Sequence, residues 1–212
     1  MHEYDVYLFD WDGTLADSTA VWLRAIQRQF ALFGLHPTVE EIVPRMGDWN
    51  NMKVFGLDDT QLKQLRDVAR QEALEQLPHA PLFDGAHDVL QYLKQKKKKL
   101  AVVTAMHRQI IDALVAHHGY GQLFDVVISG DDVQNLKPHP EALLLALDKL
   151  KRHPGETVLM LGDADRDILA AHQASVDSLL FYPPEHRMFH DLETLRGHKP
   201  THIITHWKEL KV

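Results

Sequence analysis

A buried strand that ends in two carboxylates constrains this chain more than any other stretch of its sequence. The apolar run from Tyr4 to Phe9 is interrupted only by Asp5, which is typical of a strand buried on both faces of a sheet. The run ends at Asp10 and Asp12. Carboxylates in such a place carry a large desolvation cost unless a cation or hydrogen-bond donors meet them. A cap on the following helix would account for only one of the two, so we expect partners elsewhere in the chain.

A regular alternation of short apolar runs with helical patterns begins at residue 85. We expect strands over 100–103, 124–129, 158–161, 178–182 and 202–205, and helices over 86–98, 107–118, 140–152, 165–173 and 185–196. This alternation predicts an α/β fold, in which a doubly wound parallel sheet carries helices on both faces. Ligands of such sheets bind at the carboxyl ends of the strands, so the functional side chains are expected there.

Residues 17–82 interrupt this alternation, because they contain only helical patterns. We expect helices over 19–34, 38–44 and 59–77, and a loop over 45–58. Thr38 and Glu41 have the spacing of a capping box, which marks the start of the short middle helix. The loop is predicted because its residues are polar and aromatic and include two glycines.

The chain of 212 residues is long enough for one full core and an insertion. Pro81 and Gly85 mark a linker at the end of the helical region. We therefore predict an α/β core formed by residues 1–16 and 83–212, with a small all-helical domain inserted after the first strand. We call this insertion, residues 17–82, the cap segment.

Charge and composition exclude several classes of partner and chemistry. The formal net charge of -7 argues against a nucleic-acid or anionic membrane surface. The absence of cysteine excludes disulfides, a thiol nucleophile and a thiolate metal site. No apolar run approaches the roughly 20 residues of a membrane span, and no secretory signal opens the sequence. We expect a cytoplasmic protein, either a monomer or a homodimer.

Further polar side chains follow the other predicted strands. They are Thr104, Lys137, Asp163, Asp165 and Asp167. Any one of them could be an ordinary loop residue or a helix cap. Together with the two aspartates of the first strand, however, they place so many like charges at one edge of the sheet that a cation is expected among them.

The residue types at this edge favour magnesium and phosphate. Carboxylate oxygens without histidine or cysteine suit Mg²⁺, and a lysine with the amides of a helix start suits a phosphate group. A carboxylate can act as nucleophile in phosphoryl transfer, while a second one two residues on can donate and accept protons. The residues therefore predict magnesium-dependent phosphoryl chemistry.

Four segments carry a resemblance to a known family. DWDGTLADS, VVTA, LKPHPE and LGDADRDI, in this order, resemble the four motifs of the haloacid dehalogenase-like hydrolase superfamily. The helical insertion is similar to the cap of the branch that contains phosphoglycolate phosphatase and β-phosphoglucomutase. The resemblance covers the whole chain and implies a Rossmann-like core, in which the first strand is central and the fourth lies beside it.

The resemblance also implies roles for the acidic residues. Asp10 would be the nucleophile and a Mg²⁺ ligand, and Asp12 the general acid and base, with its backbone carbonyl on the metal. Asp163 would be the main acidic ligand contributed by the fourth motif. Asp167 would be a further carboxylate on the metal or its water shell.

Thr104, the amide of Ala105, and Lys137 would hold the phosphoryl group by the same resemblance. In many relatives an asparagine follows the hydroxyl residue, whereas here Ala105 and Met106 follow Thr104. Contacts to the substrate near its phosphate are therefore expected to differ from those of such relatives.

Asp12 decides between the activities found in this superfamily. A halide leaves without a proton, so dehalogenases need no acid at that position, whereas a phosphoester leaving group does. We therefore expect a phosphatase for a small phosphorylated metabolite. A phosphomutase of the β-phosphoglucomutase type, and a phosphate-binding relative without catalytic activity, are the alternatives.

The cap segment is expected to select the substrate. Arg45, Asn50 and Asn51 offer donors in its loop, although this loop could equally be a solvated connector.

The histidines are expected to lie outside the site. His186 and His190 have a helical spacing, and beside Asp191 they favour a pair at the surface. His139, although close to Lys137 in sequence, is expected not to reach the site.

Overall fold

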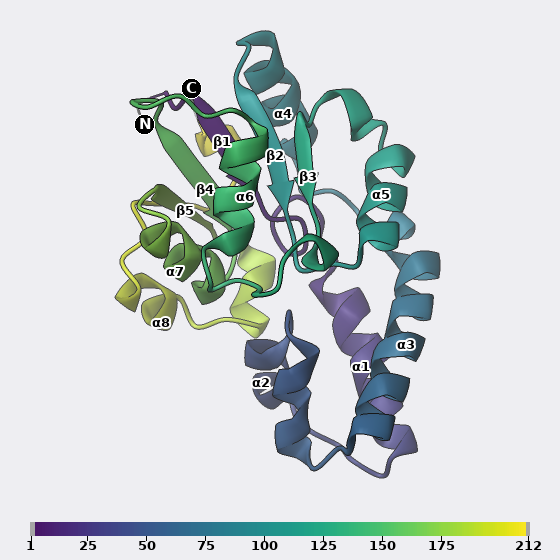
Figure 1. Cartoon of the computed structure of the whole chain (residues 1–212). Coiled ribbons are helices and arrows are strands. Elements are labelled where there is room, and N and C mark those ends of the chain that lie inside the picture. Colours follow the sequence, from purple (N-terminus) through teal and green to yellow (C-terminus); the bar gives the residue numbers. More distant parts are fainter. Residues whose placement is uncertain (1–2, 211–212) are drawn as a thin grey trace.

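The computed structural model describes residues 3–210 and shows a parallel sheet with a group of helices at one end (Figure 1). The six strands have the order β3-β2-β1-β4-β5-β6, and every pair of neighbours is parallel. The strands are β1 Val6–Phe9, β2 Lys99–Val103, β3 Val126–Ile128, β4 Val158–Gly162, β5 Asp177–Phe181 and β6 His202–Ile204. The predicted α/β fold with a doubly wound sheet is confirmed.

The register of β1 sets the geometry of the site. Phe9 pairs with Val102 of β2 on one side and with Leu161 of β4 on the other. The three central strands therefore end at nearly the same level, and the residues that follow them share one edge of the sheet. The predicted central place of the first strand, beside the fourth, is confirmed.

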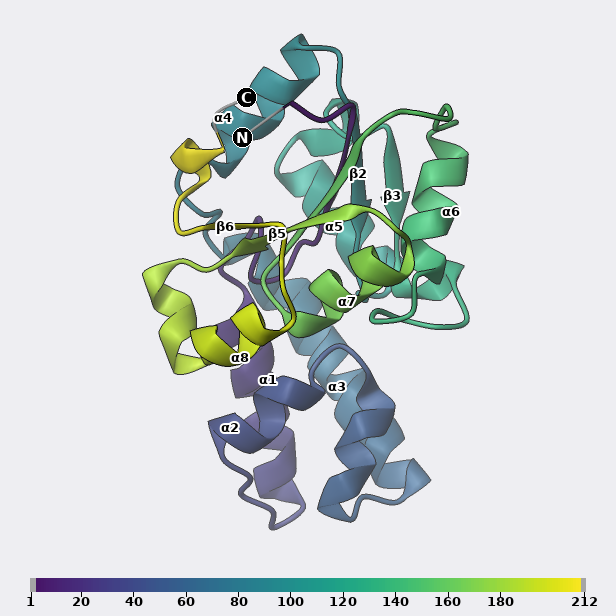
Figure 2. The same cartoon turned by 90° about the vertical axis from the view of Figure 1, so that its left-hand side faces the viewer.

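Successive side chains of β1 point to opposite faces of the sheet, as the pleat requires. Tyr7 and Phe9 belong to an apolar cluster with residues of α4 and α5, whereas Val6 and Leu8 pack with α6 and α7. These helices are α4 Ala86–Gln95, α5 Arg108–His117, α6 Glu141–Lys149 and α7 Asp165–Gln173. Figure 2 shows α4 and α6 on opposite sides of the sheet. Burial on both faces explains why β1 is almost entirely apolar.

The cap segment contains α1 Thr19–Leu32, α2 Val39–Ile42 and α3 Asp59–Gln76. Figures 1 and 2 show these helices beyond one end of the sheet. They have an apolar cluster of their own, which includes Ile26, Phe30 and Leu65. The capping box of α2 is present, because Thr38 Oγ1 accepts from the Glu41 amide at 3.3 Å and a Glu41 carboxylate oxygen accepts from the Thr38 amide at 2.8 Å.

Two passages of the chain connect the cap segment to the sheet. The Phe83 amide donates to the Leu15 carbonyl at 3.0 Å, and the Asp17 amide donates to the Pro81 carbonyl at 2.9 Å. We propose that this paired crossing is the boundary between a core of residues 1–16 and 83–212 and a cap domain of residues 17–82.

Two predicted elements differ in the structure. The region predicted as a loop contains a 3₁₀ helix over Trp49–Phe55, which Asp48 caps by accepting from the Asn50 amide at 2.9 Å. The single helix predicted over 185–196 is two pieces, a 3₁₀ helix over Pro184–Met188 and α8 Leu192–Gly197. Asp191 starts the second piece by accepting from the Thr194 amide, so local capping interrupts the longer periodic pattern.

None of the helices within residues 3–210 combines the length and the apolar character that crossing a membrane requires.

Candidate active site

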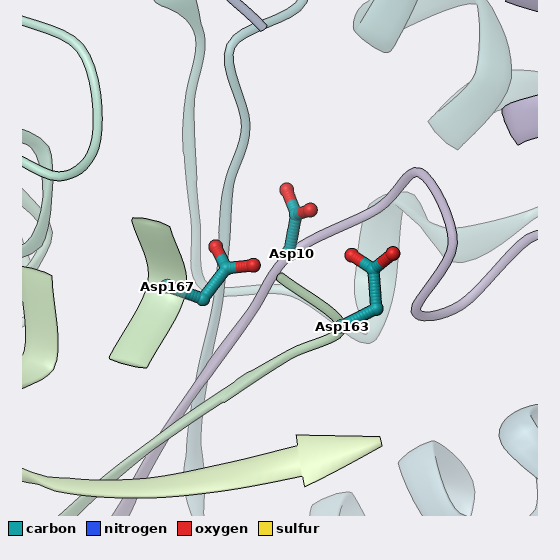
Figure 3. Close-up of side chains that lie close together, drawn as sticks. All are labelled: Asp10, Asp163 and Asp167. Atoms are coloured by element: carbon teal, nitrogen blue, oxygen red, sulfur yellow. The ribbon is translucent and has the colours of Figure 1, made fainter. Parts of the chain in front are cut away.

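Three buried carboxylates gather where β1 and β4 end. Asp10 follows β1, Asp163 follows β4, and Asp167 lies in the first turn of α7. Carboxylate oxygens of all three lie within 4.8 Å of one another, and Figure 3 shows the three carboxyl groups projecting in the same direction. The side chains are almost inaccessible to solvent, so their mutual repulsion is poorly screened.

Lys137 supplies a positive charge inside this acidic cluster. Its Nζ atom lies 2.9 Å from Asp10 Oδ1 and 2.6 Å from Asp167 Oδ1, and it donates to the Val103 carbonyl at 2.9 Å. Burial alone would lower the pKa of Lys137, but the two carboxylates raise it overall. The lysine is therefore a fixed cation that partly neutralises the cluster.

Replacing this lysine tests how strongly the cluster depends on it. Lys137→Met is expected to destabilise the metal-free protein by roughly 3–5 kcal/mol, because it leaves buried carboxylates without their cation. Denaturant unfolding in the presence of a chelator measures this. Lys63→Met, which removes an exposed i,i+4 pair with Asp67, is the control and is expected to cost no more than about 0.5 kcal/mol. Equal losses in the two variants would contradict the interpretation.

Asp10 is buried against like charges. The pKa of the Asp10 carboxyl is raised to about 7, and burial is the largest cause. The positive charge of Lys137 lowers this pKa, whereas the negative charges of Asp167 and Asp163 raise it. A nucleophilic carboxylate must be ionised, so an additional cation at this cluster would favour the reactive form.

Gly13 allows Asp163 to approach the first strand end. The residue has a φ of +72°, and a β-carbon there would overlap the Asp163 carboxylate. Only glycine combines that backbone conformation with that space. Burial would raise the pKa of Asp163, but His190, His186 and Arg166 lower it overall. Asp163 is therefore ionised at neutral pH.

Asp12 has surroundings unlike those of the cluster. One of its carboxylate oxygens, Oδ1, accepts both from Ser18 Oγ at 2.5 Å and from Trp22 Nε1 at 3.0 Å. Burial raises the pKa of Asp12 to about 6, even though these two donors lower it. The carboxyl group is therefore suited to exchange a proton near neutral pH. Trp22 belongs to α1, so the cap segment contributes directly to the surroundings of Asp12.

A cavity of about 80 Å³ joins these residues. The core contributes mostly polar side chains to its wall, among them Asp10, Asp12, Thr104, Lys137 and Asp163, together with the smaller apolar contribution of Ala105, Met106 and Ile110. The cap segment contributes mostly apolar side chains, including Trp22, Ile26, Val43, Met46, Trp49 and Met52, together with Arg70. The cavity therefore has one charged and one mainly apolar side.

The sequence-predicted cap residues lie elsewhere. Arg45, Asn50 and Asn51 are not among the residues that line the cavity. Arg45 donates to the Glu41 carbonyl at 2.5 Å, and both asparagines are exposed. The 3₁₀ helix over Trp49–Phe55 places Trp49 and Met52 in the cavity wall and leaves the side chains of Asn50 and Asn51 exposed. No periodicity in the sequence identified that short helix.

His139 lies outside the cavity wall, as expected. Its Nδ1 atom accepts from the Glu141 amide at 3.2 Å, which keeps the ring at the start of α6.

The expectation that His186 and His190 form a surface pair is wrong. His186 is 1% exposed, and its Nδ1 atom lies 3.9 Å from Asp163 Oδ2. His190 lines the cavity, with Nε2 at 3.6 Å from the same oxygen. Both residues follow the carboxyl end of β5, which lies beside β4. Their position after a predicted strand, and not their spacing of four residues, was the feature of the sequence that could have placed them near the site.

Arg166 is a further residue that the sequence analysis did not identify. It lines the cavity, and one of its guanidinium nitrogens donates to the Met46 carbonyl at 2.7 Å, which ties α7 to the cap segment. Arg166 stands inside the segment LGDADRDI, directly before Asp167, so its proximity to the site was readable from the sequence. Its contact with Met46 was not.

Comparison with known proteins supports this arrangement. A family model described as haloacid dehalogenase-like hydrolase matches residues 7–181. The chain is 31% identical over 185 residues to validoxylamine A 7'-phosphate phosphatase of Streptomyces hygroscopicus subsp. limoneus, covering 82% of this chain and 83% of that protein. It is 27% identical over 208 residues to pyrophosphatase PpaX of Oceanobacillus iheyensis, covering 96% of this chain and 93% of that protein.

Solved structures share the fold over the whole chain. A protein of Bacteroides fragilis assigned to the haloacid dehalogenase-like hydrolases superposes with a TM-score of 0.87 and 28% identity, covering 99% of this chain and 100% of that one. CbbY of Rhodobacter sphaeroides, solved in complex with phosphate, gives a TM-score of 0.81 at 22% identity, covering 98% and 96%. The resemblance inferred from the four motifs and the prediction of an enzyme are confirmed: the chain belongs to the haloacid dehalogenase-like hydrolase family.

Proposed function

We propose that this protein is a magnesium-dependent phosphatase, which hydrolyses a small phosphorylated metabolite through a covalent phosphoryl group on Asp10. The observation that carries the proposal is the buried cluster of Asp10, Asp163 and Asp167, of which Asp10 and Asp163 line the same cavity as Asp12. The cluster offers a nucleophile among potential metal ligands, and Asp12 offers a proton donor with a pKa near 6. The relatives named as phosphatases support the same reaction class.

The residues of the cluster fit a Mg²⁺ ion. The three carboxylates outnumber the Lys137 ammonium, which contacts two of them, and the nearby Arg166 guanidinium, so negative charge is in excess there. Asp163 Oδ1 is buried and has no hydrogen-bond partner within residues 3–210. Hard oxygen donors of this kind suit Mg²⁺. Asp10, Asp163 and Asp167 would hold the ion, with the Asp12 carbonyl as a further proposed ligand, and the bound ion would neutralise charge on the phosphoryl oxygens.

The proposed reaction has two steps. In the first, an Asp10 carboxylate oxygen attacks phosphorus, the bond from phosphorus to the ester oxygen breaks, and Asp12 gives its proton to the departing alcohol. In the second, Asp12 takes a proton from water, whose oxygen attacks phosphorus and releases phosphate from Asp10. Thr104, Ala105 and Lys137 would bind the phosphoryl oxygens in both steps.

The apolar side of the cavity would receive the part of the substrate that leaves. Trp22 and Trp49 meet there with their ring centroids 6.2 Å apart. Arg70 adds a guanidinium group to the same wall. A cavity of about 80 Å³ accommodates only a small molecule unless the cap segment moves.

Removal of metal tests the proposal. Hydrolysis of p-nitrophenyl phosphate is expected to fall roughly 100-fold or more in excess chelator, because a metal contributes several kcal/mol to the transition state, and to return when Mg²⁺ is restored. Sugar phosphates should release phosphate without forming an isomer. Isomer formation would favour the mutase. Full activity in chelator, or no activity on any phosphoester in Mg²⁺, would contradict the proposal.

A further inference from the structure

Asp163 is held differently from the other two carboxylates of the cluster. Asp10 and Asp167 each contact the Lys137 ammonium, at 2.9 and 2.6 Å. Oδ1 of Asp163 is buried without a hydrogen-bond partner in the described structure. Oδ2 of Asp163 faces His190 Nε2 at 3.6 Å and His186 Nδ1 at 3.9 Å. Two imidazole rings therefore approach the same oxygen of this carboxylate.

His186 is fixed in place by aromatic packing. Its ring meets Phe83 edge to face at 5.6 Å between centroids, and Phe181 at 6.0 Å. Although the side chain is almost completely buried, neither ring nitrogen has a hydrogen-bond partner among the residues that the structure describes. A buried polar group without partners is destabilising, so packing alone does not account for an imidazole at this position.

The two histidines stand behind Asp163 and are not additional ligands of the cluster. Among residues 3–210, the group of potential ligand atoms that lie within 4.8 Å of one another comprises only Asp10, Asp163 and Asp167. The imidazoles reach Asp163 from the segment after β5, the strand next to β4. They are thus placed to contact the carboxylate without entering the space between the three aspartates.

We propose that His186 and His190 are positioning residues that hold the Asp163 carboxylate in the orientation that binds a divalent cation. The inference rests on the proposed function, because it takes Asp163 to be a metal ligand. Hydrogen bonds that a metal-binding side chain makes with neighbouring residues fix its orientation and strengthen its hold on the metal. The present distances of 3.6 and 3.9 Å are slightly longer than direct hydrogen bonds, and such contacts commonly shorten when a ligand binds.

Binding of Mn²⁺, followed by electron paramagnetic resonance, measures the effect without any turnover. His190→Ala is expected to weaken Mn²⁺ binding about 10- to 100-fold. His190→Gln is expected to recover most of that loss, because its amide can donate where Nε2 stands. His153→Ala is the matched control. His153 is exposed in the turn before β4, at the amino ends of the strands, whereas the site lies at their carboxyl ends. It is expected to bind Mn²⁺ like the unmodified protein.

His186→Leu separates positioning from packing. Leucine keeps an apolar side chain of similar size against Phe83 and Phe181 and removes the two unpartnered nitrogens. The metal-free variant is expected to melt at the same or a higher temperature, yet to bind Mn²⁺ about tenfold more weakly or worse. A lower melting temperature with unchanged Mn²⁺ affinity would mean that His186 only fills space.

Asp163→Asn distinguishes failure of this inference from failure of the proposed function. If Asp163→Asn loses Mn²⁺ binding while His190→Ala and His186→Leu retain the original affinity, the positioning role is overturned and the metal site stands. If the unmodified protein does not bind Mn²⁺, or Asp163→Asn binds it equally well, the proposed metal site itself is wrong.

Discussion

Asp10→Asn is expected to abolish phosphatase turnover, with a loss of roughly 10⁴-fold or more, because an amide oxygen cannot form the covalent phosphoryl intermediate. The substitution keeps the size of the side chain and removes one charge from a cluster of like charges. The variant is therefore expected to fold, and the metal-free form should be no less stable in thermal unfolding. Loss of activity with retained stability would assign the effect to chemistry.

The control for this variant lies in the fourth motif. Asp165 is exposed and does not line the cavity, although it stands between Asp163 and Asp167 in the sequence. Asp165→Asn should therefore keep kcat within a factor of about two to three, as surface substitutions usually do. If Asp10→Asn retained a substantial fraction of the original kcat, the nucleophilic role of Asp10 would have to be abandoned.

Asp12→Asn is expected to lower kcat by roughly 10²- to 10⁴-fold, since it removes the proton donor and acceptor but not the nucleophile. The amide oxygen can still accept from Ser18 and Trp22, so the local structure should persist. The size of the loss should depend on the leaving group. An alkyl phosphate needs a proton on its departing oxygen, whereas p-nitrophenolate leaves readily without one.

A comparison of these two substrates separates acid catalysis from structural damage. In single-turnover experiments, Asp12→Asn should lose far more rate with the alkyl phosphate than with p-nitrophenyl phosphate. Trp22→Phe, which keeps the carboxyl group and removes one of its two donors, is expected to show a smaller loss with both. Equal losses of Asp12→Asn with the two substrates would argue against the acid role.

The core of the site could be predicted because it depends on short-range rules. Parallel strands end at a common edge, so the positions of Asp10 and Asp163 after their strands were enough to bring them together. The capping box of Thr38 and Glu41 depends on residues three apart, and it too was readable. Local chemistry and strand order therefore specify the charged side of the cavity.

The cap side and the histidines could not be predicted in the same way. The contact of Arg166 with Met46 joins residues 120 positions apart, and no local pattern encodes it. The 3₁₀ helix at Trp49 has no 3.6-residue period, so the residues that it turns inward were missed. His186 is polar and was expected at the surface, but its position after β5 places it beside Asp163. These positions depend on how separate elements pack.

The hydrogen bond from Arg166 to the Met46 carbonyl has a consequence for altering substrate range. A main-chain carbonyl is present whatever side chain a residue carries. Substitutions of Met46 therefore keep the hydrogen bond from Arg166, while they change the side chain that lines the cavity. Gly47 cannot be substituted in the same way, because its φ is +98° and a β-carbon there would lie 3.2 Å from the Arg166 guanidinium. A library directed at position 46 with glycine kept at 47 would therefore vary selectivity while the cap segment stays anchored to α7.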